Sequence, residues 1–472
     1  ISGGFGLIKA GEGVLTLSGL NTYTGATAVS AGALTLATGA SMSSASLSVA
    51  AGANLILNSN ATTSALTGSG NVTIGNGATL TLNTTSGNPQ FHGVFAGSGS
   101  LVKSGAGEVY LTGDNSGFTG AVTVNGGMIS TQNAFSSLGS GDVTVTANAT
   151  IGTFAAMPVG RLNNKLNVVA GSLTLGRTGR TILGNDVIAS GSGSILIGGG
   201  GVAVIEKDIR NIGTGTLSVA AGSTLQLGNG GTTGTLSGSL SYAGNLAFNR
   251  SDSVTYAGVL SGTGSLNQLG SGNLVLTGAN SYTGTTTVSA GTLLLGASER
   301  LVDGGSLTVV GGTFDLGGVA QKTGLVTLTG GTIANGTLNA SGYSLRNGTI
   351  SAVISDVTSP AVATAINKVT DGSGGGGTVV LTNVNTYTGG TNVTGGTLQL
   401  TINGALPVGR ALLVNGGTLD LGTTAQSVST LQITSGEITS TTGTIVVTGG
   451  TPFFDLQEIG RASCRERVCL YV

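Results

Sequence analysis

The residues that could carry out acid-base, nucleophilic or metal chemistry are few in this sequence. One histidine is present, His92, which follows Phe91 in a segment that also contains Pro89. A Ser-His-Asp triad would have to use this single imidazole, and a zinc site built from His and Cys needs several such ligands close together. We therefore interpret His92 as an exposed loop residue and predict no metal site.

Charged side chains are also scarce. Asp, Glu, Lys and Arg make up 7% of the chain, with 17 basic against 18 acidic residues. A β-helical polysaccharide-degrading enzyme would need carboxylates grouped with basic residues along one groove, and a nucleic-acid partner would need a basic stripe. The densest charged group, Glu206-Lys207-Asp208 with Arg210, interrupts a strand-like run. We interpret it as a solvated loop or edge, and we predict no catalytic residue and no nucleic-acid partner.

Two glycine-rich motifs resemble ligand-binding turns. Asp142 ends the run Gly139-Ser140-Gly141 in the manner of a calcium-binding turn, but the pattern does not recur as a calcium-binding β-roll would require. Residues 372–377 fit G-x-G-x-x-G only because they are nearly all glycine, and they lead into a strand rather than a helix. We predict no cofactor.

The overall composition excludes several classes of protein. The 472 residues include 88 Gly but only 5 Pro, with no strict Gly-X-Y period, so a collagen helix is excluded. Aliphatic residues are too abundant, and the net charge of −1 too small, for a disordered chain. The apolar runs are a few residues long, whereas a membrane-spanning helix needs about 20 apolar residues in a row.

A repeated unit dominates the chain. Its four long copies lie near residues 11–36, 105–129, 270–295 and 377–400. Each contains Leu or Val alternating with polar residues, followed by a motif of the type Gly-x-Asn-x-Tyr-Thr-Gly. The motif residues are Gly19, Asn21, Tyr23 and Gly25 in the first copy, Gly113, Asn115, Phe118 and Gly120 in the second, Gly278, Asn280, Tyr282 and Gly284 in the third, and Asn385, Tyr387 and Gly389 in the fourth.

The copies differ at positions where a reaction centre would not vary. Phe118 replaces the usual Tyr in the second copy, which also has the additional residue Gly117, and Asn383 replaces the first Gly in the fourth copy. Such changes indicate a structural repeat. The motif Asn residues could bind glycans, but we favour hydrogen bonding to turn amides, which is a common role of Asn in turns.

Shorter units fill the intervals between the long copies. Residues 47–57 and 217–227 each hold two alternating segments around a Gly. Alternation of Leu or Val with Thr, Ser, Asn or Gln gives the period of two that is typical of half-buried strands. One exception is expected at 359–369, where Pro360 near the start favours a short helix, followed by a Gly-rich loop over 371–377.

Two architectures are compatible with short strands joined at glycines, a string of β-sandwiches and a parallel β-helix. Sandwich cores usually contain large aromatic residues, whereas aromatics make up 4% of this chain and Trp is absent. Small residues at the bends suit coils stacked about 4.8 Å apart. We therefore predict an all-β protein folded as a parallel β-helix, a β-solenoid, with about 20–25 residues per coil and about 18–23 coils.

The last fifteen residues differ from the rest of the chain. Residues 458–472 contain both cysteines, and Glu458–Val468 resembles the in-frame translation of a common sequencing adapter. We interpret 1–457 as the native β-helical fragment and 458–472 as non-native. The sequence starts at Ile1 without Met or a leader, so we expect an incomplete reading frame, with more of the protein upstream of Ile1 and downstream of Gln457.

The long unit resembles the passenger-associated transport repeat of autotransporter proteins, which are secreted by the bacterial type V pathway. This resemblance implies a right-handed β-helical passenger in a Gram-negative-type bacterium. It also implies export through an outer-membrane β-barrel translocator belonging to the same protein, which we expect outside this sequence. In that family the repeat is linked to efficient secretion and folding of the passenger.

The leading hypothesis is a non-enzymatic stalk and secretion scaffold at the cell surface or in the secreted fraction, with adhesion as a further role. Surface glycans or proteins of host or neighbouring cells would then be partners, and the open solenoid ends would favour self-association. Two alternatives stay open. One is a stalk that carries an enzymatic domain beyond Ile1, and the other is a β-helical enzyme acting on polysaccharides.

Overall fold

The computed structural model shows a chain built from strands. It describes residues 1–131, 138–153, 159–176, 179–356, 364–370 and 376–449, together with the backbone of 453–454 and 469–471. Within these residues no helix is present, and the chain forms a parallel β-solenoid of about 21 turns. The prediction of an all-β solenoid is confirmed, and the number of turns lies within the predicted range.

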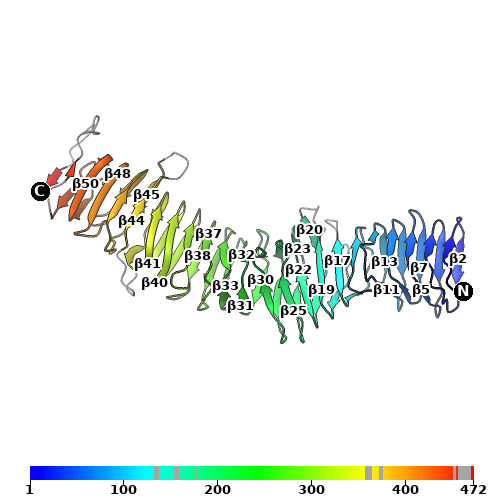
Figure 1. The fold of residues 1–472 in the computed structure, drawn as a ribbon. Helices are drawn as coiled ribbons and strands as arrows, with labels where there is room; N and C mark the ends of the chain where they lie inside the picture. The colour runs from blue at the N-terminus through cyan, green and yellow to red at the C-terminus, as the bar shows by residue number, and fades with distance from the viewer. Residues whose placement is uncertain are drawn as a thin grey trace. The chain divides into compact units, whose positions relative to one another are not determined.

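The chain divides into two compact units. The first contains residues 1–229 and 233–246, and the second contains residues 230–232 and 247–472. In Figure 1 the strands of each unit follow one another as a stack, from blue to green in the first unit and from green to red in the second. Each unit is described by itself below.

The strands of the first unit lie in three faces, and successive coils add neighbouring parallel strands to each face. One face contains β1 (Leu7–Lys9), β3 (Thr27–Val29), β6 (Leu47–Val49), β9 (Leu66–Gly68), β12 (Gln90–Phe91), β15 (Glu108–Leu111), β17 (Gly127–Thr131), β19 (Ala149–Thr153), β22 (Ser172–Leu175), β25 (Ser194–Ile197) and β28 (Leu217–Val219). A second contains β5 (Met42–Ser44), β8 (Ala61–Thr63), β11 (Thr79–Asn83), β14 (Ser100–Ser104), β16 (Val122–Val124), β18 (Val143–Val145), β21 (Leu166–Val168), β24 (Val187–Ala189), β27 (Asp208–Asn211) and β30 (Thr235–Ser237). The third is formed by β2 (Val14–Leu17), β4 (Ala33–Leu36), β7 (Asn54–Leu57), β10 (Asn71–Ile74) and β13 (Val94–Gly97), and further along by β20 (Val159–Leu162), β23 (Arg180–Leu183), β26 (Val202–Ile205) and β29 (Thr224–Leu227).

The core of this unit consists of aliphatic columns. Strands β4 and β7 pair so that Leu34 lies beside Leu55 and Leu36 beside Leu57, and all four are buried. The residues between them point outward, as the period of two predicts. Burial of each such side chain contributes about 1.5–3 kcal/mol before the loss of conformational entropy is subtracted. The stack therefore depends on many similar small contributions.

The second unit stacks in the same way. Its strands include β33 (Ser253–Tyr256), β35 (Ser265–Gln268), β36 (Asn273–Leu276), β37 (Thr286–Val288), β38 (Thr292–Leu295), β39 (Leu307–Val309), β40 (Thr313–Leu328), β41 (Thr332–Leu345), β42 (Gly348–Ile350), β43 (Val353–Asp356), β44 (Ile366–Lys368), β45 (Thr378–Leu381), β46 (Thr391–Val393), β47 (Thr397–Leu400), β48 (Ala411–Asp420), β49 (Ala425–Val428), β50 (Thr430–Thr439) and β51 (Thr444–Val447). Strands β40 and β41 are long enough to continue from one face to the next. Strand β40 accordingly pairs with β38 near its start and with β39 near its end.

The predicted short helix at 359–369 is wrong over its described part. Residues 366–368 form strand β44, which pairs in parallel with β41 on one side and β46 on the other. Ile366 and Lys368 are buried while Asn367 points outward, so the period of two and the hydrogen bonds from both neighbouring coils outweigh the local helix preference. Residues 359–363 and 371–375 lie outside the described part of the chain.

Coil length varies along the stack. Thr27 pairs with Leu47 in the next coil, at the lower end of the predicted spacing. Asn71 pairs with Asn54 in the preceding coil, a step of 17 residues that is shorter than predicted. It also pairs with Val94 in the following coil, a step of 23 residues that lies within the predicted range. The segments that join the faces absorb the difference, because the strands themselves stay in register.

The C-terminal segment lies mostly outside the described residues. Its strand β53 (Cys469–Tyr471) pairs in parallel with β51. Nothing in the described residues forms a helix that is long and apolar enough to cross a membrane.

Close stacking predicts a strong cost for adding a methyl group at Gly278. A Cβ there would lie 2.2 Å from the carbonyl oxygen of Gly258 in the preceding coil, so we expect Gly278→Ala to destabilise this region by about 1–3 kcal/mol. Gly19 holds the same motif position, but a Cβ there would have no atom within 4 Å, and Gly19→Ala is the matched control. Thermal melts followed by circular dichroism, with hydrogen exchange of residues 256–282, should show loss of protection only for Gly278→Ala. Equal behaviour of the two variants would contradict this steric account.

Candidate functional site

The four copies of the motif occupy equivalent places in the solenoid. Each lies in the corner segment that joins one strand to the next, between β2 and β3, β15 and β16, β36 and β37, and β45 and β46. The motif Asn side chains, together with Tyr23, Phe118, Tyr282 and Tyr387, are buried. The motif therefore contributes a polar part of the core instead of a surface site.

In the third copy, amide side chains connect successive coils. Asn280 Oδ1 accepts a hydrogen bond from the backbone N–H of Leu260 (2.8 Å), and Asn280 Nδ2 donates to the carbonyl oxygen of Arg300 (2.8 Å). One coil further on, Gln321 Oε1 accepts from the N–H of Leu301 (3.0 Å), and Gln321 Nε2 donates to the carbonyl of the same residue (3.0 Å). Two buried amides thus join backbone segments that belong to successive coils.

The fourth copy repeats this arrangement. Asn385 Oδ1 accepts from the N–H of Ile354 (2.8 Å), and its Nδ2 donates to the carbonyl of Ala405 (2.8 Å). Gln426 Oε1 then accepts from the N–H of Leu406 (3.0 Å). Because an unbonded buried amide costs about 1–3 kcal/mol, each side chain favours the one stacking arrangement that supplies its partners.

The first two copies use their Asn side chains in the same way. Asn21 Nδ2 donates to the carbonyl of Ser41 in the following coil (3.0 Å), and Asn115 Oδ1 accepts from the N–H of Phe95 in the preceding coil (2.6 Å). All four motif Asn residues therefore bond to the backbone of a neighbouring coil.

A buried tyrosine hydroxyl forms a second polar contact within the motif. In three copies it is hydrogen-bonded to the threonine four residues later, in the pairs Tyr23–Thr27 (2.7 Å), Tyr282–Thr286 (2.6 Å) and Tyr387–Thr391 (2.7 Å). Burial raises the pKa of each of these tyrosines above its usual value. The hydroxyls therefore stay protonated and serve packing, not acid-base chemistry.

The second copy changes both members of this pair together. Phe118 replaces the Tyr, and Val122 occupies the position of the Thr, with both side chains buried. Phe118 packs near Phe95, with ring centroids 6.2 Å apart. Replacing both hydrogen-bonding partners by apolar groups is nearly neutral, whereas replacing one leaves a buried hydroxyl unbonded. The paired change could have been found in the sequence by comparing the residue four places after each aromatic.

A buried lysine before the motif was not anticipated from the sequence. Lys103 is fully buried, and its ammonium donates to the carbonyls of Ser104 (2.6 Å), Gly105 (2.8 Å) and, in the next coil, Gly126 (3.3 Å). Burial lowers the pKa of Lys103 to about 8, so the group is mostly charged at neutral pH. The ammonium caps the carbonyls of the glycine turn that follows β14.

Equivalent side chains precede the other three copies. Lys9 donates to Ala31 in the next coil (2.9 Å), Lys368 donates to Gly395 (2.9 Å), and Gln268 in the third copy donates to the carbonyl of Gly270 (2.9 Å). The available signal was a Lys or Gln at the inward position of an alternating strand just before each motif.

The last glycine of each motif permits close approach of the preceding coil. A Cβ at Gly25, Gly120, Gly284 or Gly389 would lie 1.6–2.4 Å from backbone atoms of that coil. Because such overlaps involve backbone atoms, no larger residue fits without moving the coils apart. This requirement explains why the motif ends in glycine.

His92 and Asp142, the other candidate residues, form isolated side-chain hydrogen bonds. His92 is exposed, and its Nδ1 is hydrogen-bonded to Thr112 Oγ1 in the next coil (2.7 Å). Asp142 accepts from Asn167 Nδ2 (3.3 Å). Among the described residues no group of three or more His, Cys, Asp or Glu side chains could hold a metal ion.

The charged group around Glu206, for which the sequence predicts a solvated loop or edge, begins in the bend between β26 and β27, where Lys207 is exposed. Glu206 follows β26 directly and forms an ion pair of 2.6 Å with Arg161, which belongs to an earlier coil, and this hydrogen bond lowers the pKa of Glu206. Asp208 and Arg210 belong to β27 and pair with each other at 2.6 Å. Arg161 and Glu206 come together across coils because stacking brings residues far apart in sequence side by side.

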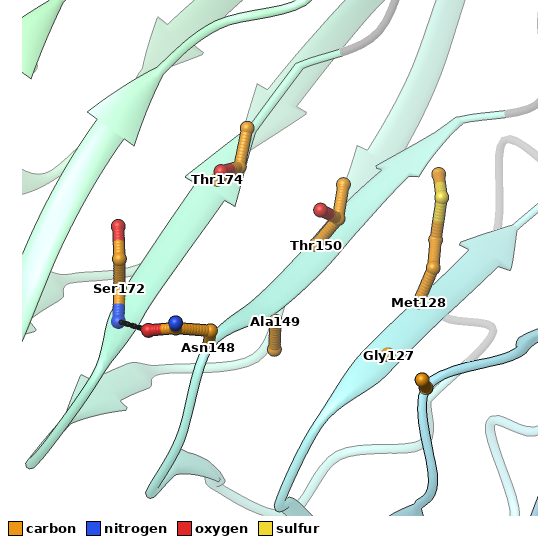
Figure 2. A pocket seen from close by; sticks show the side chains of 8 residues that line it. Gly127, Met128, Asn148, Ala149, Thr150, Ser172 and Thr174 are labelled. Carbon is orange, nitrogen blue, oxygen red and sulfur yellow. Dashed lines mark hydrogen bonds between the residues drawn. The ribbon is translucent and has the colours of Figure 1, made fainter. Parts of the chain in front are cut away.

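A shallow hollow lies on the outer face of β17, β19 and β22 (Figure 2), with a volume of about 530 Å³. Met128, Thr150 and Thr174 follow one another along it, and Asn148 Oδ1 accepts a hydrogen bond from the N–H of Ser172 (2.9 Å). The lining consists of small polar and apolar side chains without an ionisable group. The hollow therefore offers contact area but no acid, base or nucleophile pair.

Comparisons with known proteins agree with this geometry. The chain matches the passenger-associated-transport-repeat family at residues 7–36, 101–130, 266–295 and 374–400. It is 38% identical over 224 residues to the adhesin BmaC autotransporter of Brucella suis biovar 1 (strain 1330), a match that covers 46% of this chain and 6% of that protein. No solved structure matches the chain significantly.

The fold and the repeated polar core thus define a parallel β-solenoid built around passenger-associated transport repeats. The chain therefore carries four passenger-associated transport repeats and is similar to a part of an autotransporter adhesin. The matched segments contain the motif Asn of every copy and also Lys9, Lys103 and Gln268.

The Tyr–Thr pair predicts a strong coupling between its two members. Tyr387→Phe alone leaves the buried Thr391 hydroxyl without its partner, so we expect a loss of about 1–3 kcal/mol. Tyr387→Phe combined with Thr391→Val reproduces the pair found in the second copy and should cost clearly less. A double-mutant cycle measured by chemical denaturation would test this, and additive losses would argue against the coupling.

The buried lysine predicts different effects for two substitutions. Lys103→Met leaves three carbonyl groups without their donor and should destabilise the chain by about 1–3 kcal/mol. Lys103→Gln supplies the amide donor that Gln268 provides in the third copy, so it should cost less. The exposed Lys207 supplies the control, since Lys207→Met should change stability by less than about 0.5 kcal/mol. The midpoints of urea unfolding provide the comparison, and a Met variant as stable as the Gln variant would refute the capping role.

Proposed function

We propose that this chain is a non-enzymatic part of a surface-displayed or secreted passenger, and that it acts as a stalk and secretion scaffold. The observation that supports this most directly is the use of the motif side chains. The polar groups of Asn, Tyr and the preceding Lys or Gln are buried. The Asn side chains bond to the backbone of adjacent coils, the Tyr hydroxyls bond to a Thr of their own coil, and the Lys or Gln side chains bond to carbonyls of the turn that follows them. They maintain the shape of the solenoid and do not face a substrate.

The proposal also covers the protein to which this chain belongs, its translocator domain and its location. An autotransporter passenger implies a linked outer-membrane translocator domain and a location at the surface of a Gram-negative bacterium. We place this chain within a longer passenger, with 1–457 as native solenoid and 458–472 as a non-native tail.

Adhesion is the activity that we propose for the whole protein, in keeping with its similarity to an autotransporter adhesin. The outer face of the second unit supports this role. It carries a column of half-exposed hydroxyl and amide side chains in register, which comprises Asn267, Thr287, Thr308, Thr327, Ser344, Asn367 and Asn392. Such an uncharged face suits hydrogen bonding to surface glycans or proteins of another cell.

The scaffold role predicts that the buried Asn residues are needed for display. With the chain placed between a secretion leader and an outer-membrane translocator, replacement of Asn21, Asn115, Asn280 and Asn385 by Ala should lower the amount of protease-accessible passenger at least several-fold. Unbonded backbone groups in four corners would slow folding at the surface. Antibody labelling of intact cells measures the displayed amount.

The matched control replaces outward-facing Asn residues, with Asn267→Ala and Asn392→Ala. It should leave display unchanged while reducing binding of the cells to glycan-coated or cell-coated surfaces. Equal display by the buried-Asn variant and the parent would contradict the scaffold role. The release of new reducing ends from a polysaccharide by the purified parent chain would contradict the non-enzymatic assignment.

A further inference from the structure

We propose that the buried Asn and Gln side chains of the repeats fix the register in which successive coils stack. The role is separate from secretion and adhesion, because it concerns which of several similar stacking arrangements the chain adopts. The third copy shows the relevant contacts most completely.

The aliphatic core by itself distinguishes only partly between registers. In the pairing of β36 with β38, Leu274 lies beside Leu293 and Leu276 beside Leu295. A slip by two residues would keep the same side chains facing inward and would place Leu276 beside Leu293. One leucine pair would thus form again, while Leu274 would lie beside Gly291 and Leu295 beside Gly278.

Corner length alone does not fix the pairing. In the first unit Asn71 pairs with Asn54 on one side and with Val94 on the other, so two neighbouring coils differ in length while their strands remain paired. The close-contact glycines Gly278 and Gly284 restrict the stacking sterically. The buried amides add a hydrogen-bond requirement to this steric one.

The amide contacts are specific to one register. Asn280 needs the N–H of Leu260 before it and the carbonyl of Arg300 after it, both at 2.8 Å. A two-residue slip moves a strand by about 6.6 Å, which is well beyond hydrogen-bond reach. The amide of Asn280, which is 6% exposed, would then lose these partners.

A second amide, that of Gln321, ties the next pair of coils to one register in the same way. Gln321 is fully buried and bonds to both backbone groups of Leu301. The backbone from Leu260 to Gln321 is thus tied at three consecutive coil boundaries. In coiled coils a single buried Asn selects register at some cost in stability, and the same physical argument applies to stacked coils.

The Tyr282–Thr286 bond of the same copy provides an internal contrast. It joins residues four apart within one coil, so a slip between coils leaves it intact. Its loss should reduce stability without changing register. Copy two, which has Phe118 and Val122 in these places, is stacked in the same way as the others.

Disulfide trapping can read the register directly. In a background with Cys464→Ser and Cys469→Ser, Val275→Cys with Leu294→Cys reports the observed pairing, since these outward residues are neighbours. Val275→Cys with Thr292→Cys reports the slipped pairing. Adjacent parallel strands allow a disulfide, whereas Cα atoms more than about 7 Å apart do not. The parent chain should therefore crosslink only the first pair.

Replacement of both amides should populate the slipped register. In Asn280→Leu with Gln321→Leu, we expect crosslinking of the slipped pair to rise at least tenfold, with the β-sheet circular dichroism retained. The control Tyr282→Phe with Thr286→Val should crosslink only the observed pair. If the double variant fails to fold, Asn280→Leu and Gln321→Leu are tested singly. The measured quantity is again the crosslinking of the slipped pair relative to that of the observed pair.

Two results would overturn the proposal. A folded Leu variant that crosslinks only the observed pair would show that register is set elsewhere. Loss of the sheet in both single variants would show that these amides are required to form the solenoid at all, instead of selecting among its registers.

Discussion

Stacking of backbone on backbone at about 4.8 Å is the constraint on which the rest of this structure depends. Each coil bonds to the coil before and the coil after it, so any residue lies beside the residue at the same position one coil away. Corners can then hold only small residues where coils touch, as at Gly120 and Gly284. Inward positions favour side chains that pack on their own kind.

The same constraint explains why polar groups can be buried here. A corner leaves backbone N–H and carbonyl groups that the strand ladders do not use, and these must be satisfied. Asn280 and Asn385 meet that need between three coils, and Lys103 meets it within a glycine turn and across to the next coil. These polar side chains determine which backbone groups lie next to each other, whereas burial of the leucine columns supplies most of the free energy of folding.

The fold was largely predictable from the sequence, and the polar core only partly. Alternating aliphatic residues with glycine bends indicated stacked strands, and the recurring Asn and Tyr marked the corners. The buried lysines were missed because lysine is almost never fully buried unless it is paired, and the sequence alone does not show carbonyls gathered around Lys103. The strand at Ile366–Lys368 was missed because its hydrogen bonds come from coils far away in the sequence.

Stacked positions are separated by a few tens of residues at most, as in the pairs Asn280 with Arg300 and Ile354 with Asn385. This short separation has a consequence for chains with more turns. The entropy lost on closing a loop depends only weakly on loop length, and here each new turn closes a short loop. Folding speed falls as contacting residues lie further apart in sequence relative to chain length. Adding turns leaves the absolute separation unchanged, so a much longer relative of this chain could assemble turn by turn without meeting a slower step.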